Sequence, residues 1–178
     1  MAIMARALPN AHSAAALFLM ALSVVAAAMP PKDLCTRTLV VTEVYNDDGW
    51  SMPAHLREVS DNITNIIGYT TGYNDPAVWG GSGTSTRRVG TVLSTCFLQS
   101  VSPSGGQYNY CTATLTVGDY GSISWMGPFN DEEGDEFYNA ITGGTGIYNG
   151  ATGSVRTNVL KTAELWRYQF TFLEKPKC

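Results

Sequence analysis

The sequence predicts an all-β fold with one hydrophobic core, built as a barrel or a sandwich. Segments rich in β-branched and aromatic residues follow one another along the chain, which is typical of strands. Glycine, proline, asparagine or aspartate separates these segments, as expected for turns. The 178 residues, of which 44% are hydrophobic, suffice for one good core and are few for two.

The first segment is expected to be a signal peptide that spans residues 1–28. Arg6 precedes an apolar run from Ala14 to Ala28. This run is short for a membrane span, and it ends in the small residues that signal peptidase accepts. The alternative is a retained N-terminal anchor. We therefore expect a single domain over residues 29–178 that enters the secretory route, so the protein is secreted or stays in the secretory lumen.

Seven segments carry the strand pattern. In chain order they are residues 36–45, 88–101, 107–118, 121–127, 137–144, 151–160 and 164–173. Seven or eight short strands at this spacing indicate a β-barrel or a β-sandwich. Residues 53–67 are compatible with one short helical turn. Residues 70–86 form the longest stretch without a strand pattern and are expected to be a loop at the mouth of a barrel.

The glycines near the C-terminal half do not predict a phosphate site. Gly144, Gly146 and Gly150 lack the spacing of a dinucleotide fingerprint, and β-branched residues follow them instead of a helix. We expect residues 143–146 to reverse the chain with positive φ, and Gly150 and Gly153 to allow a bulge or close packing.

Charge and histidine content exclude several functions. The formal net charge is −4, so a nucleic-acid partner is not expected. The acidic run over residues 131–136 lacks EF-hand spacing and is predicted to face solvent. After loss of residues 1–28, His55 is the only histidine, so neither a histidine-based zinc site nor a catalytic triad is predicted. No metal site and no stable membrane insertion are expected.

The four cysteines suit a secreted chain. A bridge between Cys35 and Cys178 would tie the two ends of the mature chain, and it is predicted on that ground. Cys96 and Cys111 flank a turn sequence and can meet across a hairpin, so they either pair or stay reduced in the core. Asn62 begins an Asn-Ile-Thr sequon and is a candidate glycosylation site.

Two glycine-rich motifs resemble the allene oxide cyclases. They are "GDYGSISWMGP" and "FYNAITGGTGIYNGATGSV"; "SMPAHL" and "RRVGTVLSTC" upstream extend the likeness. The resemblance implies an eight-stranded antiparallel β-barrel with an elongated apolar cavity, a homotrimer and no cofactor. It also implies binding of a hydrophobic small molecule, a fatty-acid epoxide that closes stereoselectively to a cyclopentenone.

The resemblance also assigns site residues. It implies catalytic roles for Glu43, Asn46, Pro53 and Cys96, and ligand contacts for Tyr69, Thr71 and Phe129. Because Glu43 and Asn46 are three residues apart, one of them must point outward unless a bulge intervenes. The strand pattern leaves open which one faces inward. Only Glu43 among the acidic residues lies within an apolar, β-branched run, where burial would raise its pKa.

Two alternatives remain beside a cyclase. The signal peptide, the sequon and the terminal cysteines resemble the dirigent proteins, secreted trimers that steer the coupling of phenoxy radicals. A carrier of hydrophobic ligands would also suit an apolar barrel. For the compartment, the resemblance adds the plastid as an alternative, since land-plant allene oxide cyclases work there.

Overall fold

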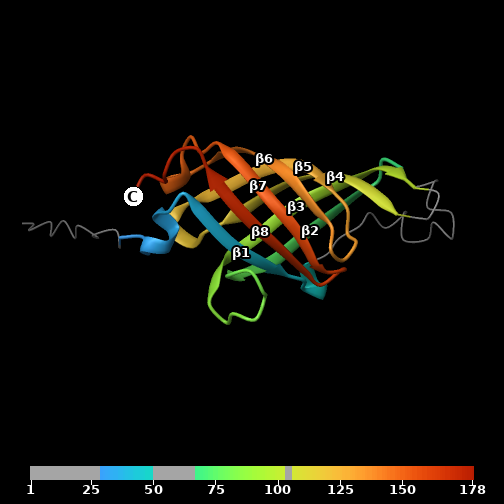
Figure 1. Cartoon of the computed structure of the whole chain (residues 1–178), viewed down its shortest axis with the longest axis horizontal. Helices are drawn as coiled ribbons and strands as arrows, with labels where there is room; N and C mark the ends of the chain where they lie inside the picture. Colours follow the sequence, from blue (N-terminus) through green and yellow to red (C-terminus); the bar gives the residue numbers. More distant parts are fainter. Residues whose placement is uncertain (1–28, 50–66, 103–105) are drawn as a thin grey trace, which may run out of the picture.

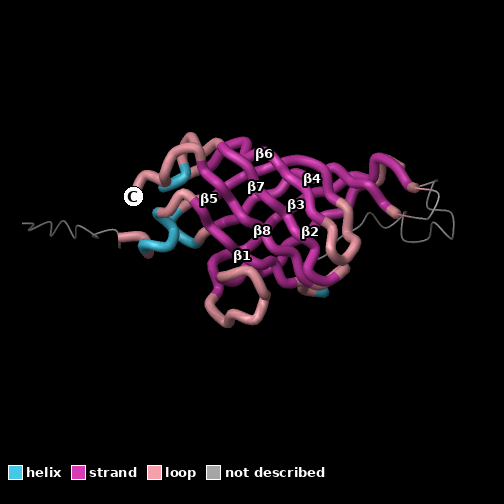
Figure 2. Tube along the Cα trace, viewed as in Figure 1, coloured by secondary structure: helices cyan, strands magenta, loops and turns pink. Residues whose placement is uncertain are grey.

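The computed structural model describes residues 29–49, 67–102 and 106–178, and these form one closed β-barrel. Each strand pairs with its neighbours in the chain, and the last strand returns to the first (Figure 1). Every pairing is antiparallel. Strands make up most of the described chain, with short helical turns and loops at the ends (Figure 2). The all-β prediction and the eight-stranded antiparallel barrel are confirmed.

The strands follow the predicted segments closely. Their bounds are β1 Thr38–Val44, β2 Thr70–Trp79, β3 Arg88–Val101, β4 Gln107–Thr116, β5 Ser122–Phe129, β6 Glu136–Gly144, β7 Gly153–Lys161 and β8 Leu165–Phe172. Short 3₁₀ turns lie at Lys32–Cys35, Asp47–Gly49, Gly118–Tyr120 and Gly146–Tyr148. Each of the seven predicted strands agrees with an observed one to within two residues at either end.

The prediction of a loop over residues 70–86 was wrong for its first half. Residues 70–79 form β2, which pairs with β3 along its length. Pairing of β2 with β1 covers only Ala77, Val78 and Trp79. Pro76, which lacks an N–H, therefore lies where β2 has no β1 partner, the edge-like position that proline tolerates in a sheet. Residues 80–87 do form a loop.

The interior is packed at one end and hollow at the other. Near the chain termini, Leu39, Phe170 and Phe172 are almost fully buried, and the rings of Phe170 and Phe172 stack at 6.4 Å. Tyr148 stacks on Phe172 from the 3₁₀ turn, with centroids 5.6 Å apart. The next inward position of β8 toward the other end, Tyr168, borders the cavity described below.

The glycine-rich turn between β6 and β7 reverses the chain as predicted. Gly146 has φ +60°, and a Cβ there would lie 2.2 Å from the Tyr120 carbonyl oxygen. Gly143, Gly150 and Gly153 also have positive φ. A side chain at position 146 would meet both a backbone clash and an unfavourable conformation.

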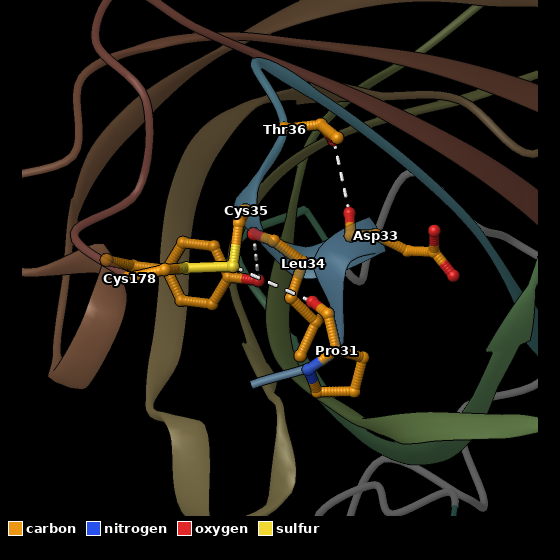
Figure 3. Close-up of a disulfide and its surroundings, with 7 residues drawn as sticks. Pro31, Asp33, Leu34, Cys35, Thr36 and Cys178 are labelled. Atoms are coloured by element: carbon orange, nitrogen blue, oxygen red, sulfur yellow. Dashed lines mark hydrogen bonds between the residues drawn. A yellow bond between two sulfur atoms is a disulfide. The ribbon is translucent and has the colours of Figure 1, made fainter. Parts of the chain in front are cut away.

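The two ends of the described chain are joined covalently. Cys35, at the end of the first 3₁₀ turn, forms a disulfide with Cys178 (Figure 3). Leu34, beside it, is buried, and its carbonyl oxygen accepts a hydrogen bond from the Tyr148 hydroxyl at 3.4 Å. The expected pairing of Cys35 with Cys178 is present.

Other expectations fall on residues 1–28 and 50–66. The signal peptide, Pro53, His55, Asn62 and nearly all of the expected helical turn over residues 53–67 lie outside the described residues. Within the described ranges, none of the helices has the length and apolar character needed to span a bilayer.

Candidate functional site

The hollow end of the barrel holds a cavity of about 500 Å³, within the usual range for a small-molecule site. The lining combines aromatic rings with carboxyl, amide and hydroxyl groups, so it is more polar than an apolar pocket. Its residues are Glu43, Tyr45, Tyr69, Thr71, Tyr73, Ser94, Cys96, Gly106, Gln107, Asn109, Cys111, Ala113, Trp125, Phe129, Asn130, Asp131, Glu132, Asn139, Thr162, Ala163, Trp166 and Tyr168.

Glu43 points into this cavity from β1. Alternation along the strand places Val41, Glu43 and Tyr45 on the inward face, and Glu43 is only 3% exposed. Its Oε2 accepts a 2.5 Å hydrogen bond from the hydroxyl of Tyr168 on β8. The strand pattern did not decide which face of β1 points inward; the structure shows that it is the face with Glu43.

Burial raises the pKa of Glu43 to about 8, because a desolvated carboxylate is costly. The Tyr168 hydrogen bond opposes this shift, while the nearby charge of Asp75 adds to it. Near neutral pH the Glu43 carboxyl therefore holds its proton for most of the time. Burial and the neighbouring Glu43 also raise the pKa of the Tyr168 hydroxyl well above its ordinary value.

Asp75 forms the second half of a buried acid pair. It lies on β2, fully excluded from solvent, and its Oδ1 accepts a 2.8 Å hydrogen bond from the Asn46 backbone N–H. Its Oδ2 finds no donor among the described residues when both acids are ionised. Burial raises the pKa of Asp75, and the Asn46 N–H and the neighbouring Glu43 carboxyl oppose that rise. Asp75 in turn adds to the raised pKa of Glu43. A proton held by Glu43 thus supplies the donor that Asp75 lacks.

Asp131 contributes a third carboxyl group to the wall. Its Oδ1 accepts a 2.7 Å hydrogen bond from Trp166 Nε1, and its Oδ2 accepts one of 3.0 Å from the Ala163 N–H. These bonds tie the β5–β6 loop to the β7–β8 turn beside the cavity. The acidic run was predicted to face solvent; Glu132 and Glu133 are exposed, but Asp131 is partly buried, and burial raises its pKa.

Two of the expected catalytic residues have no free reactive side chain in the cavity. The Asn46 side chain is exposed and lies outside the cavity lining, since the residue follows the end of β1 and only its backbone N–H meets the acid pair. Cys96 lines the cavity but forms a disulfide with Cys111, its direct cross-strand partner. The bridge leaves Cys96 without a free thiol.

The three expected ligand-contacting residues all border the cavity. Tyr69 precedes β2, and Thr71 is buried on it opposite Cys96. Phe129 ends β5, and its ring packs edge-on against Phe137 at 5.6 Å. Pro53 and Asn62 lie outside the described residues.

The sequence reasoning missed Asp75, Asp131, Trp166 and Tyr168. Asp75 lay in the stretch taken as a loop, although Thr71, Tyr73 and Asp75 already alternate there. Within "ELWRYQFTFL", Trp166, Tyr168 and Phe170 alternate with polar residues. This alternation predicts an inward face of β8 and would have identified Trp166 and Tyr168. Over the described ranges, no group of three or more His, Cys, Asp or Glu side chains is placed to hold a metal ion.

Comparisons with known proteins agree with this architecture. The family model of allene oxide cyclase matches residues 33–174. Among solved structures, a pyocyanin demethylase is 20% identical with a TM-score of 0.56, covering 76% of this chain and 98% of its own. A pterocarpan synthase dirigent protein is 16% identical, with a TM-score of 0.56 and coverage of 74% and 79%. An exo-specific intermolecular Diels–Alderase is 14% identical, with a TM-score of 0.54 and coverage of 76% and 96%. At these identities the likeness shows a shared fold.

Proposed function

Because the chain belongs to the allene oxide cyclase family, we propose that its cavity binds a reactive, lipid-derived small molecule and directs its stereoselective cyclisation without a cofactor. The observation that carries the proposal is a buried acid, Glu43, which faces a cavity of about 500 Å³ among aromatic rings. The chain thus unites a confined space with a positioned charge, as the steering of a reactive intermediate requires.

Confinement is the first contribution of the barrel. Trp125, Phe129, Trp166 and Tyr168 line the cavity, and Trp125 packs on Tyr168 with centroids 5.2 Å apart. Rings fixed by such packing restrict a flexible ligand to few conformers, and they exclude the water that would otherwise open an epoxide. One folded conformer leads to one hand of the ring product.

Charge is the second contribution. In this proposal Glu43 and Asp75 share one proton and so carry a single negative charge next to the cavity. The Tyr168 hydroxyl donates a hydrogen bond that fixes the Glu43 carboxyl in place. A positive charge that develops on the opening epoxide would be stabilised by this fixed negative charge in a water-poor site. Glu43 is the proposed catalytic residue, and Asp75 is a positioning residue that acts through it.

A second candidate function is dirigent-like steering of phenoxy-radical coupling. It is favoured by the seven aromatic residues of the lining, namely Tyr45, Tyr69, Tyr73, Trp125, Phe129, Trp166 and Tyr168, which suit planar phenols. The fold shared with a dirigent protein is compatible with it. A carrier would bind the same ligands without altering the stereochemistry of any reaction.

The deciding experiment supplies mature protein with freshly generated allene oxide, as the free acid and as its methyl ester, and analyses the cyclopentenone on a chiral column. Enantiomeric excess supports the cyclase. In a parallel arm, a phenol is oxidised by one electron in the presence of the protein, and excess of one coupled enantiomer supports the dirigent-like role. Racemic products in both arms, together with measurable ligand binding, favour a carrier.

Assembly and compartment form part of the proposal. We propose a homotrimer that enters the secretory route, with residues 1–28 as its signal peptide and Asn62 as a glycan site. The two disulfides, Cys35–Cys178 and Cys96–Cys111, suit an oxidising compartment. N-terminal sequencing, glycan analysis and analytical ultracentrifugation of protein from a secreting host test these points; a retained residue 1 or a monomer would contradict them.

A further inference from the structure

The ionisable side chains that the structure describes in the cavity lining are all carboxyl groups or tyrosines, with no basic group. Among the described lining residues, Glu43, Asp131 and Glu132 are acidic, and none is Lys, Arg or His. Their burial decreases from Glu43, through Asp131, to the exposed Glu132. The buried Asp75 adds a further carboxyl beside Glu43. Among the described lining side chains, a ligand that passes from solvent to the acid pair thus meets acidic groups and no basic ones.

Basic side chains of the neighbouring strands do not offset these charges. Arg156 on β7 pairs with Glu136, and Lys161 pairs with Glu164 at 2.6 Å. Arg167 on β8 donates two hydrogen bonds to Asn158 Oδ1, at 2.8 and 3.2 Å. Arg156 and Arg167 alternate with the inward residues of their strands and so point away from the cavity. The negative potential of the cavity is therefore not neutralised from these strands.

The uncharged aromatic residues of the lining also favour a cation. Seven aromatic residues border the cavity, and the faces of such rings attract cations. Rings and carboxylates together select planar, positively charged groups. A ligand carboxylate would instead meet like charge at short range, in a site where low polarity strengthens the repulsion.

We propose that the cavity selects a flat aromatic ligand that carries a positive charge, as an N-alkylated heteroaromatic ring does. This inference rests on the proposed function in one respect, namely that the cavity is the ligand site, and it adds a second class of ligand to the lipid-derived molecule proposed above. An anionic lipid would enter only with its carboxylate outside in solvent, or as an ester. A cation formed during a reaction would be held by the same groups as a bound cationic ring.

Three probes of one shape test the selection. The 10-methylacridinium ion, neutral acridine and acridine-9-carboxylate share a planar three-ring frame and differ in charge. Binding is measured by quenching of protein tryptophan fluorescence at mildly alkaline pH and low salt, and then at high salt. We expect the cation to bind at least tenfold more tightly than acridine, the anion to bind most weakly, and added salt to reduce this preference.

Two variants of the β5–β6 loop test whether the preference for the cation comes from the cavity lining. Glu132→Gln removes a charge from the lining, whereas Glu133→Gln removes the same charge from an exposed neighbour outside it. We expect Glu132→Gln to weaken methylacridinium binding about two- to fivefold, as befits an exposed charge, and to leave acridine binding unchanged. Glu133→Gln should alter neither affinity by more than about a factor of two.

Equal affinities for cation and neutral probe, tightest binding of the anion, or no binding of any probe would overturn the inference. So would equal effects of Glu132→Gln and Glu133→Gln on methylacridinium binding. The proposed function fails separately: stereoselective cyclisation of the allene oxide ester without methylacridinium binding leaves the function standing and removes only the charge selection. Methylacridinium binding without any stereoselective product leaves the charge selection standing and removes the proposed cyclase function.

Discussion

The buried acid Glu43 should make the stability of the barrel fall as pH rises. Between the ordinary value of 4.5 and its raised pKa of about 8, the folded protein holds a proton that the unfolded chain has released. The free energy of unfolding then decreases with pH, by about 1.4 kcal/mol for each pH unit in that window. Glu43 stabilises the fold least above its raised pKa, where the buried carboxylate is ionised.

Replacing Glu43 by Gln tests this reasoning, because the amide is neutral at every pH. A Gln side chain can still accept a hydrogen bond from the Tyr168 hydroxyl and can donate one to Asp75, so the amide can replace both hydrogen bonds of the protonated carboxyl. On one-proton linkage, the stability of the wild type relative to Glu43→Gln should drop by about 3.5 kcal/mol between pH 5 and pH 8. The contribution of Asp75 is present in both proteins and largely cancels.

The assay is reversible urea unfolding with intact disulfides, followed by tryptophan fluorescence at several pH values across the window. Glu133→Gln, which removes an exposed carboxyl, is the matched control, and its curve should run parallel to that of the wild type. If wild type and Glu43→Gln instead keep a constant separation from pH 5 to pH 8, Glu43 does not hold its proton in the fold. The shared-proton account of Glu43 and Asp75 would then be wrong.

Glu43→Gln should also lower the initial rate of stereoselective cyclisation by about a hundredfold, because the negative charge of the pair is then confined to Asp75, which does not line the cavity; an unchanged rate would mean that Glu43 is not the catalytic group. Replacing Cys96 and Cys111 together by Ala should lower the free energy of unfolding by about 3 kcal/mol on the chain-entropy model, and an unchanged urea midpoint would contradict it. Gly121→Ala places a Cβ 2.1 Å from a carbonyl oxygen at φ +121°, whereas Gly134→Ala has positive φ but open space. The first should cost several kcal/mol and the second about 1; equal urea midpoints would refute the steric argument.

Strand composition and turn residues sufficed to predict most of the fold. Seven strands follow from β-branched and aromatic runs, because in a barrel each strand buries one face and the pattern survives in the sequence. The eighth, β2, carries Gly72, Asn74, Asp75 and Pro76 within it. These residues are common in turns, and only the pairing of β2 with β3 overrides that local preference.

The candidate site was less predictable, because its residues meet through closure of the barrel. Glu43 was identified from the family resemblance and from its apolar surroundings. Its inward face required the register of β1 against β8, where Glu43 lies opposite Trp166. Tyr168 is 125 residues away in the chain, and no local pattern pairs the two. The sequence left open whether Glu43 or Asn46 faces inward, because it does not show that β1 ends at Val44, before Asn46. The pairing of Cys96 with Cys111 depended on a cross-strand register that their spacing alone could not decide.

The bond between Cys35 and Cys178 turns the barrel chain into a covalent ring, since the two residues are 143 positions apart and lie at its two ends. A single backbone cut anywhere between the two cysteines therefore opens the ring but leaves all of its parts covalently joined. A protease that nicks the exposed loop at residues 80–87 would thus leave a single molecule of unchanged mass, apart from one added water, until the disulfide is reduced. In the nicked product the covalent path begins at β3, runs through β8, crosses the disulfide to β1 and ends at β2. This is the strand order of a circular permutant, with a disulfide in place of the joining peptide bond.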